Sequence, residues 1–65
     1  MITVTDRRGI AVAYINKQHK LADGYRAHEP WLLLHIPGRV DRFAKQAEAK
    51  EEAKKTWPGC SFHRT

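Results

Sequence analysis

Alternation of hydrophobic and polar residues predicts β-strands in the first part of the chain. Residues 2–5 (ITVT) follow the period-two pattern of a half-buried strand rich in β-branched side chains. Residues 10–15 are apolar at odd and even positions alike, which predicts a strand covered on both faces near the centre of its sheet. The pair Asp23-Gly24 is a strong turn signal, and a third strand is expected to begin near Tyr25.

The most hydrophobic segment of the chain is residues 31–36, which predicts a buried strand. Pro30 precedes it, and proline is tolerated mainly at strand starts, edges and bulges. Successive side chains of a strand point to opposite faces, so the segment divides into two sets. We expect one face to carry Trp31, Leu33 and His35, and the other to carry Leu32, Leu34 and Ile36.

Residues 39–56 predict the one helix, because Ala, Lys, Glu, Gln and Arg dominate them and no helix breaker interrupts them. Gly38 is expected to be its N-cap. Residues 57–59 (WPG) end it, and residues 60–63 form either a short final strand or an irregular tail. The fold class is therefore α+β: a small antiparallel sheet of three to four strands packed against one C-terminal helix, in a single domain spanning residues 1–65.

At about 100° per residue, the predicted helix has one narrow apolar stripe and two different flanks. The stripe is expected to lie on the sheet, whereas one flank mixes acidic and basic residues. The other flank carries no acid, and small residues separate its long polar and basic ones. The stripe consists of Val40, Phe43, Ala44 and Ala47, and the acid-free flank of Arg39, Arg42, Gln46 and Lys50 around Ala49 and Ala53.

The positive charge of the chain favours a polyanionic partner. Lys and Arg outnumber Asp and Glu by 12 to 7, which gives a formal net charge of +5. Our leading hypothesis is a non-enzymatic module that binds DNA or RNA through the acid-free helix flank and basic loops. A solvated helix face supported by intrahelical ion pairs is the plainer alternative. The candidate phosphate or carboxylate contacts are Arg39, Arg42, Lys50, Arg7, Arg8, Lys17 and Lys20.

Two further hypotheses involve protein partners. The first is an inhibitor or accessory module that binds an acidic surface, or the nucleic-acid channel, of a host protein complex. Trp57 is then the candidate interface aromatic, because it stands about a quarter turn from the predicted stripe. The second is a homodimer that uses Leu32, Leu34 and Ile36, or an open sheet edge, to complete a core too small for one chain.

The sequence carries little of the chemistry that enzymes and metal sites need. Sixty-five residues leave no room for a deep catalytic cleft, and no catalytic motif occurs. Cys60 is the only cysteine, and its C-x-x-H spacing to His63 has no second ligand pair, so we expect neither a metal nor a cofactor. The start of the chain lacks a secretory pattern, and apolar runs such as residues 10–15 and 31–34 are far too short to span a bilayer, which predicts a cytoplasmic protein that does not enter the membrane.

The order of the expected elements resembles a group of known small proteins. The expected order is strands, then an Ala/Lys/Glu-rich helix that runs into Trp57-Pro58-Gly59, then a strand-like CSFH segment. This order is similar to the layout of accessory proteins encoded by phages and mobile elements. Some of those proteins bind host enzymes or defence complexes, and others bind DNA. The layout also resembles the DNA-binding arm domains of tyrosine recombinases, although those carry more basic and aromatic residues on the sheet than residues 10–15 do. These resemblances imply a fold and a class of partner, and they assign no functional residue.

Overall fold

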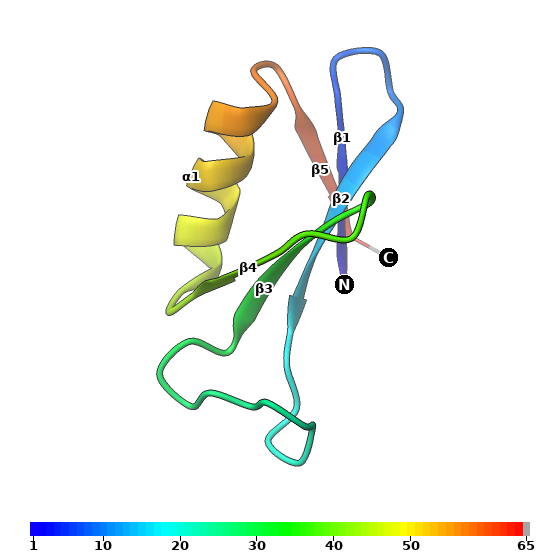
Figure 1. Ribbon diagram of the computed structural model, residues 1–65. Coiled ribbons are helices and arrows are strands. Elements are labelled where there is room, and N and C mark those ends of the chain that lie inside the picture. Colours follow the sequence, from blue (N-terminus) through cyan, green and yellow to red (C-terminus); the bar gives the residue numbers. More distant parts are fainter. Residues whose placement is uncertain (65) are drawn as a thin grey trace.

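Five strands and one helix make up residues 1–64, the part of the chain that the computed structural model describes (Figure 1). The sheet has the order β4-β3-β2-β1-β5, and every neighbouring pair is antiparallel. This arrangement confirms the predicted α+β class, with five strands in place of three to four. The elements are β1 Ile2–Thr5, β2 Ala11–Lys17, β3 Trp31–His35, β4 Val40–Phe43, α1 Gln46–Thr56 and β5 Ser61–Arg64.

Three predicted strands are present, but the one expected near Tyr25 is wrong. The backbone N–H of Gln18 donates to the Pro30 carbonyl at 2.8 Å, which ends the pairing of β2 with β3. Residues 18–30 between them form a loop of turns, one of them closed by a 3.1 Å bond from the Tyr25 N–H to the Ala22 carbonyl. This segment has no alternating apolar residues to bury, so nothing draws it into the sheet.

The predicted helix start at residue 39 is also wrong, because residues 40–43 form β4. Gly38 is not a helix N-cap: it has a φ of +109° in a tight hairpin turn that Pro37 precedes. The Gly38 N–H donates to the His35 carbonyl, and the His35 N–H donates to the Arg39 carbonyl, both at 2.8 Å. Val40 then pairs with Leu34. Valine and phenylalanine fit a strand well, and here an adjacent apolar strand supplies the partner.

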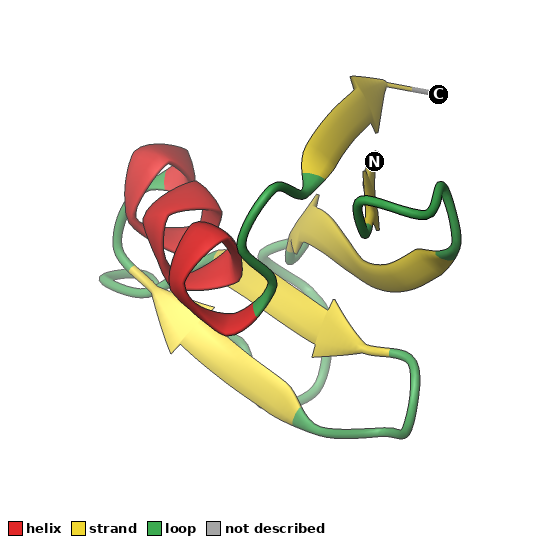
Figure 2. Ribbon diagram, turned by 90° about the horizontal axis from the view of Figure 1, so that it is seen from above, coloured by secondary structure: helices red, strands yellow, loops and turns green. Residues whose placement is uncertain are grey.

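The helix lies on the sheet through two alanines. Ala49 and Ala53 are fully buried, whereas Ala44 and Ala47 of the predicted stripe are exposed, so the predicted face of the helix is wrong. Figure 2 shows α1 over β3 and β4, on one face of the sheet. Small side chains at both contact positions allow the helix backbone to approach the strands closely.

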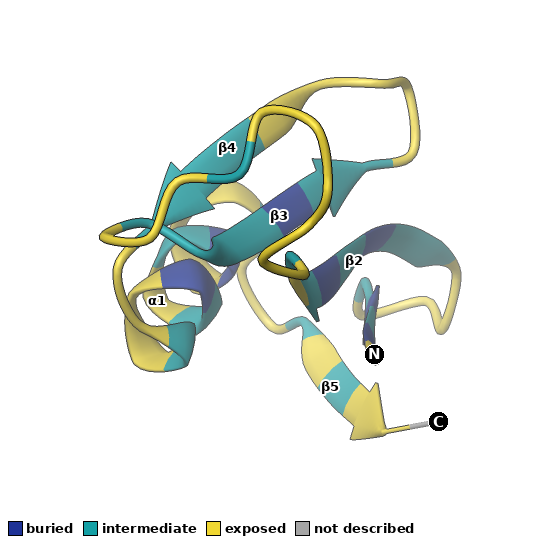
Figure 3. Cartoon of the chain, turned by 90° about the horizontal axis from the view of Figure 1, so that it is seen from below, coloured by how far each residue is buried: buried dark blue, intermediate teal, exposed yellow. Residues whose placement is uncertain are grey.

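The core is a single layer between α1 and the sheet (Figure 3). Leu33 pairs with Ile15 and Ile15 with Ile2, so the three side chains form one buried row across the sheet. No helix or strand of residues 1–64 covers the opposite face, which corrects the expectation that the central strand is covered on both sides. The buried residues are Ile2, Val4, Ala13, Ile15, Leu33, Ala49 and Ala53.

The N-terminus of α1 is the simplest place to stabilise this small protein. Lys45 is the N-cap residue, with the extended backbone that a cap requires (φ −132°, ψ 149°), but its side chain makes no capping hydrogen bond. We expect Lys45→Ser to add about 1 kcal/mol, because its hydroxyl can accept a bond from a free N–H of the first turn. Thermal unfolding should then shift upward by roughly 4–8 °C. Lys54→Ser, at an exposed position inside the helix, should give no increase.

Candidate functional site

The predicted basic helix flank does not exist as a surface, because Arg39 and Arg42 lie outside the helix. Arg39 is exposed, and its Nε lies 3.4 Å from the Asp41 carboxylate, which also bonds His35 at 3.0 Å. Arg42 donates from Nη1 to the Gln18 side-chain oxygen at 2.7 Å. Both arginines are thus already paired, Arg39 with a residue two positions along its own segment and Arg42 with Gln18 of the loop 18–30, and the open hollow that both line also contains the carboxylates of Asp41 and Glu52.

The β1–β2 turn, which contains Arg7 and Arg8, lies at one end of the molecule, and the loop between β2 and β3, which contains Lys20, lies at the other (Figure 1). The two arginines are exposed in the β1–β2 turn, where the Asp6 carboxylate accepts the N–H groups of Arg8 and Ile10 at 2.8 and 3.0 Å. They border an open hollow of about 370 Å³ beside the α1–β5 turn. Lys20 is exposed in the loop 18–30. The predicted basic residues are therefore not gathered into one patch.

Trp57 is mainly a packing residue. It is half-buried against the core, and its ring lies 5.0 Å from the His35 ring, tilted by 47°. Its backbone N–H donates to the Ala53 carbonyl at 2.8 Å, which closes the end of α1. The expected interface aromatic thus holds the end of the helix on the sheet.

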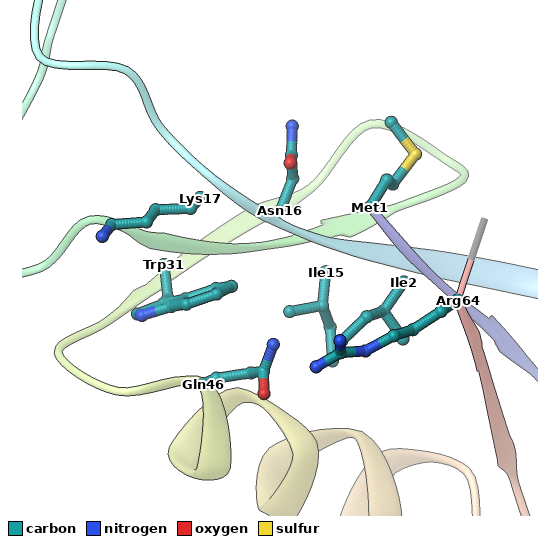
Figure 4. A pocket seen from close by; sticks show the side chains of 8 residues that line it. All are labelled: Met1, Ile2, Ile15, Asn16, Lys17, Trp31, Gln46 and Arg64. Carbon is teal, nitrogen blue, oxygen red and sulfur yellow. The ribbon is translucent and has the colours of Figure 1, made fainter.

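A pocket of about 330 Å³ opens between the sheet and the first turn of α1 (Figure 4). Ile2 and Ile15 line it on the sheet side, and Trp31 forms part of the wall. In Figure 4 the Arg64 guanidinium and the Gln46 amide point toward the same space, and Lys17 lies beside Trp31 at the edge. The full lining is Met1, Ile2, Ile15, Asn16, Lys17, Trp31, Gln46 and Arg64, without an acidic side chain.

A further cation lies beside this pocket, on the side of α1 that faces β5. Lys50 follows Gln46 by one helical turn, and its Nζ lies 5.6 Å from the centre of the Phe62 ring. Phe62 and Arg64 share one face of β5, because they pair with Val4 and Ile2, whose side chains both belong to the core cluster that also contains Ala49 and Ala53. We call this surface, formed by Lys17, Trp31, Gln46, Lys50, Phe62 and Arg64, the α1–β5 groove.

The three cations of the α1–β5 groove have no anionic partner within residues 1–64. The ion pairs of this part of the chain use Arg26, His28, His35 and Arg39, each with Glu29 or Asp41. Lys17, Lys50 and Arg64 form none. The groove therefore presents concentrated positive charge beside two aromatic rings, which suits an anion that carries flat groups.

Sequence reasoning identified two of these cations and missed the third. Lys17 and Lys50 were both candidate contacts, and the structure brings them to the same groove. Arg64 was missed because residues 60–63 fitted an irregular tail as well as a strand. The detectable signal was the start of an alternation after Cys60, which places Phe62 and Arg64 on the same side of a strand.

The geometry gives no metal centre or membrane span in the described chain. Across residues 1–64, no three His, Cys, Asp or Glu side chains are close enough together to hold an ion. The His63 ring is instead hydrogen-bonded to the Thr5 hydroxyl at 3.0 Å. The helix in this range is too short and too polar to cross a bilayer.

Neither family models, nor curated proteins, nor solved structures match this chain.

Proposed function

We propose that this protein is a non-enzymatic nucleic-acid-binding module that holds single-stranded DNA or RNA in the α1–β5 groove. The observation that supports the proposal is the set of three cations, Lys17, Lys50 and Arg64: the pocket that Lys17 and Arg64 line has no acidic side chain, and none of the three forms an ion pair within residues 1–64. Phosphates along a strand meet such a set with charge-assisted contacts, and the released counterions supply much of the binding free energy.

A single strand suits this groove better than a duplex does. Trp31 is half-buried and borders the pocket, so an unpaired base can stack on the exposed part of its indole ring. A duplex keeps its bases stacked inside and offers Trp31 no such contact. The pocket, at about 330 Å³, lies at the lower end of the roughly 300–1,000 Å³ range of ligand pockets. It therefore has the size for one unit of a polymer that continues along the groove.

Neutralising the groove cations tests the proposal. We expect Arg64→Gln and Lys50→Gln each to weaken binding of a fluorescent single-stranded oligonucleotide about fivefold at about 0.1 M salt, because each removes one phosphate contact. The slope of log affinity against log salt should fall by about 0.7 in each variant. Titration by fluorescence anisotropy over a series of salt concentrations measures both quantities.

Lys55→Gln is the matched control, since it makes the same change on the exposed side of the same helix. All three variants lower the net charge of +5 by one, so a general charge effect would weaken them equally. Unchanged affinity in Lys55→Gln with losses in the other two supports a local site. Equal losses in all three, or no salt dependence in the native protein, would contradict the proposal.

An acidic protein segment is the alternative ligand of the same cations. A competition experiment with an acidic polypeptide distinguishes this ligand from a nucleic acid. Base stacking should quench the fluorescence of Trp31, and the quenching should disappear in Trp31→Phe, which keeps an aromatic ring against the core. Polyglutamate offers charge without bases. If it displaces the oligonucleotide at equal charge concentration and no quenching accompanies oligonucleotide binding, the groove binds an acidic protein segment and the nucleic-acid proposal fails.

A further inference from the structure

The sheet face opposite α1 carries a row of apolar side chains that no helix or strand of residues 1–64 covers, and the loop 18–30 reaches this face at Arg42, where Gln18 and Gly24 lie against the guanidinium. Register places Tyr14 beside Leu34 and Leu34 beside Val40, so three strands contribute to one continuous row. Leu32 lies next to this row, and Ile36 follows β3 at its far end. Val40 and Ile36 are 49% and 51% exposed, unusually high values for apolar residues in and beside a sheet. Apolar rows of this kind on a small protein mark a contact surface.

Charge is depleted on this face and dense elsewhere. Among the residues of β1 to β4 that point this way, within the described chain, Arg42 is the one full charge, and it is already bonded to Gln18. Lys, Arg, Asp and Glu account for 29% of the whole sequence. Depletion of charge at the centre, with tyrosine and aliphatic residues in its place, is the composition of an interface core.

We infer that this open face binds a second copy of the same chain, face to face about a two-fold axis near Tyr14. Tyr14 is the middle residue of β2, and β2 is the central strand of the sheet, so the axis passes through the centre of the patch. The two Arg42 side chains then lie on opposite sides of the axis, next to the edge strand β4, where like charges do not oppose each other. The two α1–β5 grooves face outward on opposite sides of the dimer.

The size of the face and of the core both fit self-association. Ordinary strand spacing and rise make the whole five-strand face roughly 20–25 Å across the strands and about 17 Å along them, and the apolar row occupies the part formed by β2, β3 and β4. With side chains standing on it, its area is on the order of the 600 Å² per partner found at the small end of specific interfaces. The core under α1 has seven buried residues, three of them alanines, and the chain has a single cysteine. Domains this small often gain stability by pairing.

Unused hydrogen-bonding groups surround the apolar row. Neither the Tyr14 hydroxyl nor the Asn16 amide bonds another side chain or backbone group of residues 1–64. In a two-fold contact each can meet its counterpart or the other group across the axis, because an isologous interface brings the same residues together from both copies. Tyrosine is also among the residues that dominate binding energy in such contacts.

Sedimentation equilibrium over a concentration series tests the inference. The native protein should approach twice its monomer mass with a dissociation constant in the micromolar range, as the small area implies. Leu34→Lys and Val40→Lys should each raise that constant at least about tenfold, because each places a charge in the apolar row. Leu21→Lys is the control: Leu21 is 99% exposed in the loop 18–30, and the variant gains the same charge without affecting the dimer.

Three results would overturn the inference. A native protein that stays monomeric up to about 1 mM leaves the face to a different protein partner. A dimer that neither lysine variant weakens is formed by another surface. Equal weakening in Leu21→Lys would make the effect one of net charge. If Leu34→Lys fails to fold by circular dichroism, Val40→Lys decides alone, since its half-exposed side chain can change without disturbing the core.

Discussion

Ala53→Glu is expected to leave the protein unfolded at room temperature. Ala53 is fully buried where α1 meets the sheet, in contact with the cluster that includes Leu33 and Ala49. A carboxylate there is either buried without a partner or forces the helix away from the strands, and each outcome costs several kcal/mol. A domain of this length has a total stability of roughly 3–10 kcal/mol. Far-ultraviolet circular dichroism and a urea titration measure the loss.

Ala47→Glu is the matched variant, with the same chemical change on the same helix. Ala47 is exposed in the first turn, where a negative charge interacts favourably with the helix dipole, so we expect stability to stay within about 0.5 kcal/mol of the native value. The helical phase predicted from the sequence gives the opposite ranking, with Ala47 buried and Ala53 exposed. A folded Ala53→Glu together with an unfolded Ala47→Glu would therefore refute the observed phase of α1.

Leu33→Ala is expected to lower the free energy of unfolding by about 2–5 kcal/mol. Leu33 is fully buried at the centre of the sheet, next to Ile15, and is among the three largest fully buried side chains. The small alanines of α1 cannot fill the space that the lost methyl groups leave, so most of the cavity remains. The midpoint of urea unfolding reports the change, provided that the slope of the transition is unchanged.

Leu21→Ala provides the comparison, because Leu21 is 99% exposed and loses no packing. Its unfolding midpoint should match that of the native protein. A loss below about 1 kcal/mol in Leu33→Ala would mean that the sheet and helix close over the cavity, which a tightly packed core does not allow. Such a result would contradict the observed position of Leu33 beneath the helix.

Strand positions could be predicted from the sequence because alternation is a local signal. Residues 2–5 carried it clearly, whereas residues 31–36 were predicted from their hydrophobicity. The assignment of alternate residues of β3 to two faces is confirmed: Leu33 is buried while Leu32 and Leu34 lie on the open face. The helix start could not be found in this way. Val40 and Phe43 are three residues apart, a spacing that fits one side of a helix, yet in a strand they point to opposite faces. Pairing with β3 decides between a helix and a strand for residues 40–43, and such pairing is not visible in a local sequence pattern.

The cations of the α1–β5 groove could be predicted only in part, because their charge is visible in the sequence and their arrangement in space is not. Lys17 and Lys50 were chosen for charge alone, and their meeting depends on how far β2 and α1 lie from β5, which composition does not show. Arg39 and Arg42 were chosen on a helical phase that does not exist there. The missing information was the strand itself and its contacts: in an extended chain Asp41 lies on the same side as Arg39 and pairs with it, and the bond from Arg42 to Gln18 joins two segments that are distant in the sequence.

The strand order has a consequence for the time course of folding. β2, β3 and β4 follow one another along the chain and pair as neighbours, so they need only short loop closures. β5 pairs with β1 alone, and the register of Ile2 with Arg64 joins the two ends of the described chain. Closing so long a loop has the largest entropic cost, and it becomes favourable only after the intervening segments are ordered. We therefore expect the wall of the groove that carries Arg64 to be assembled last during refolding.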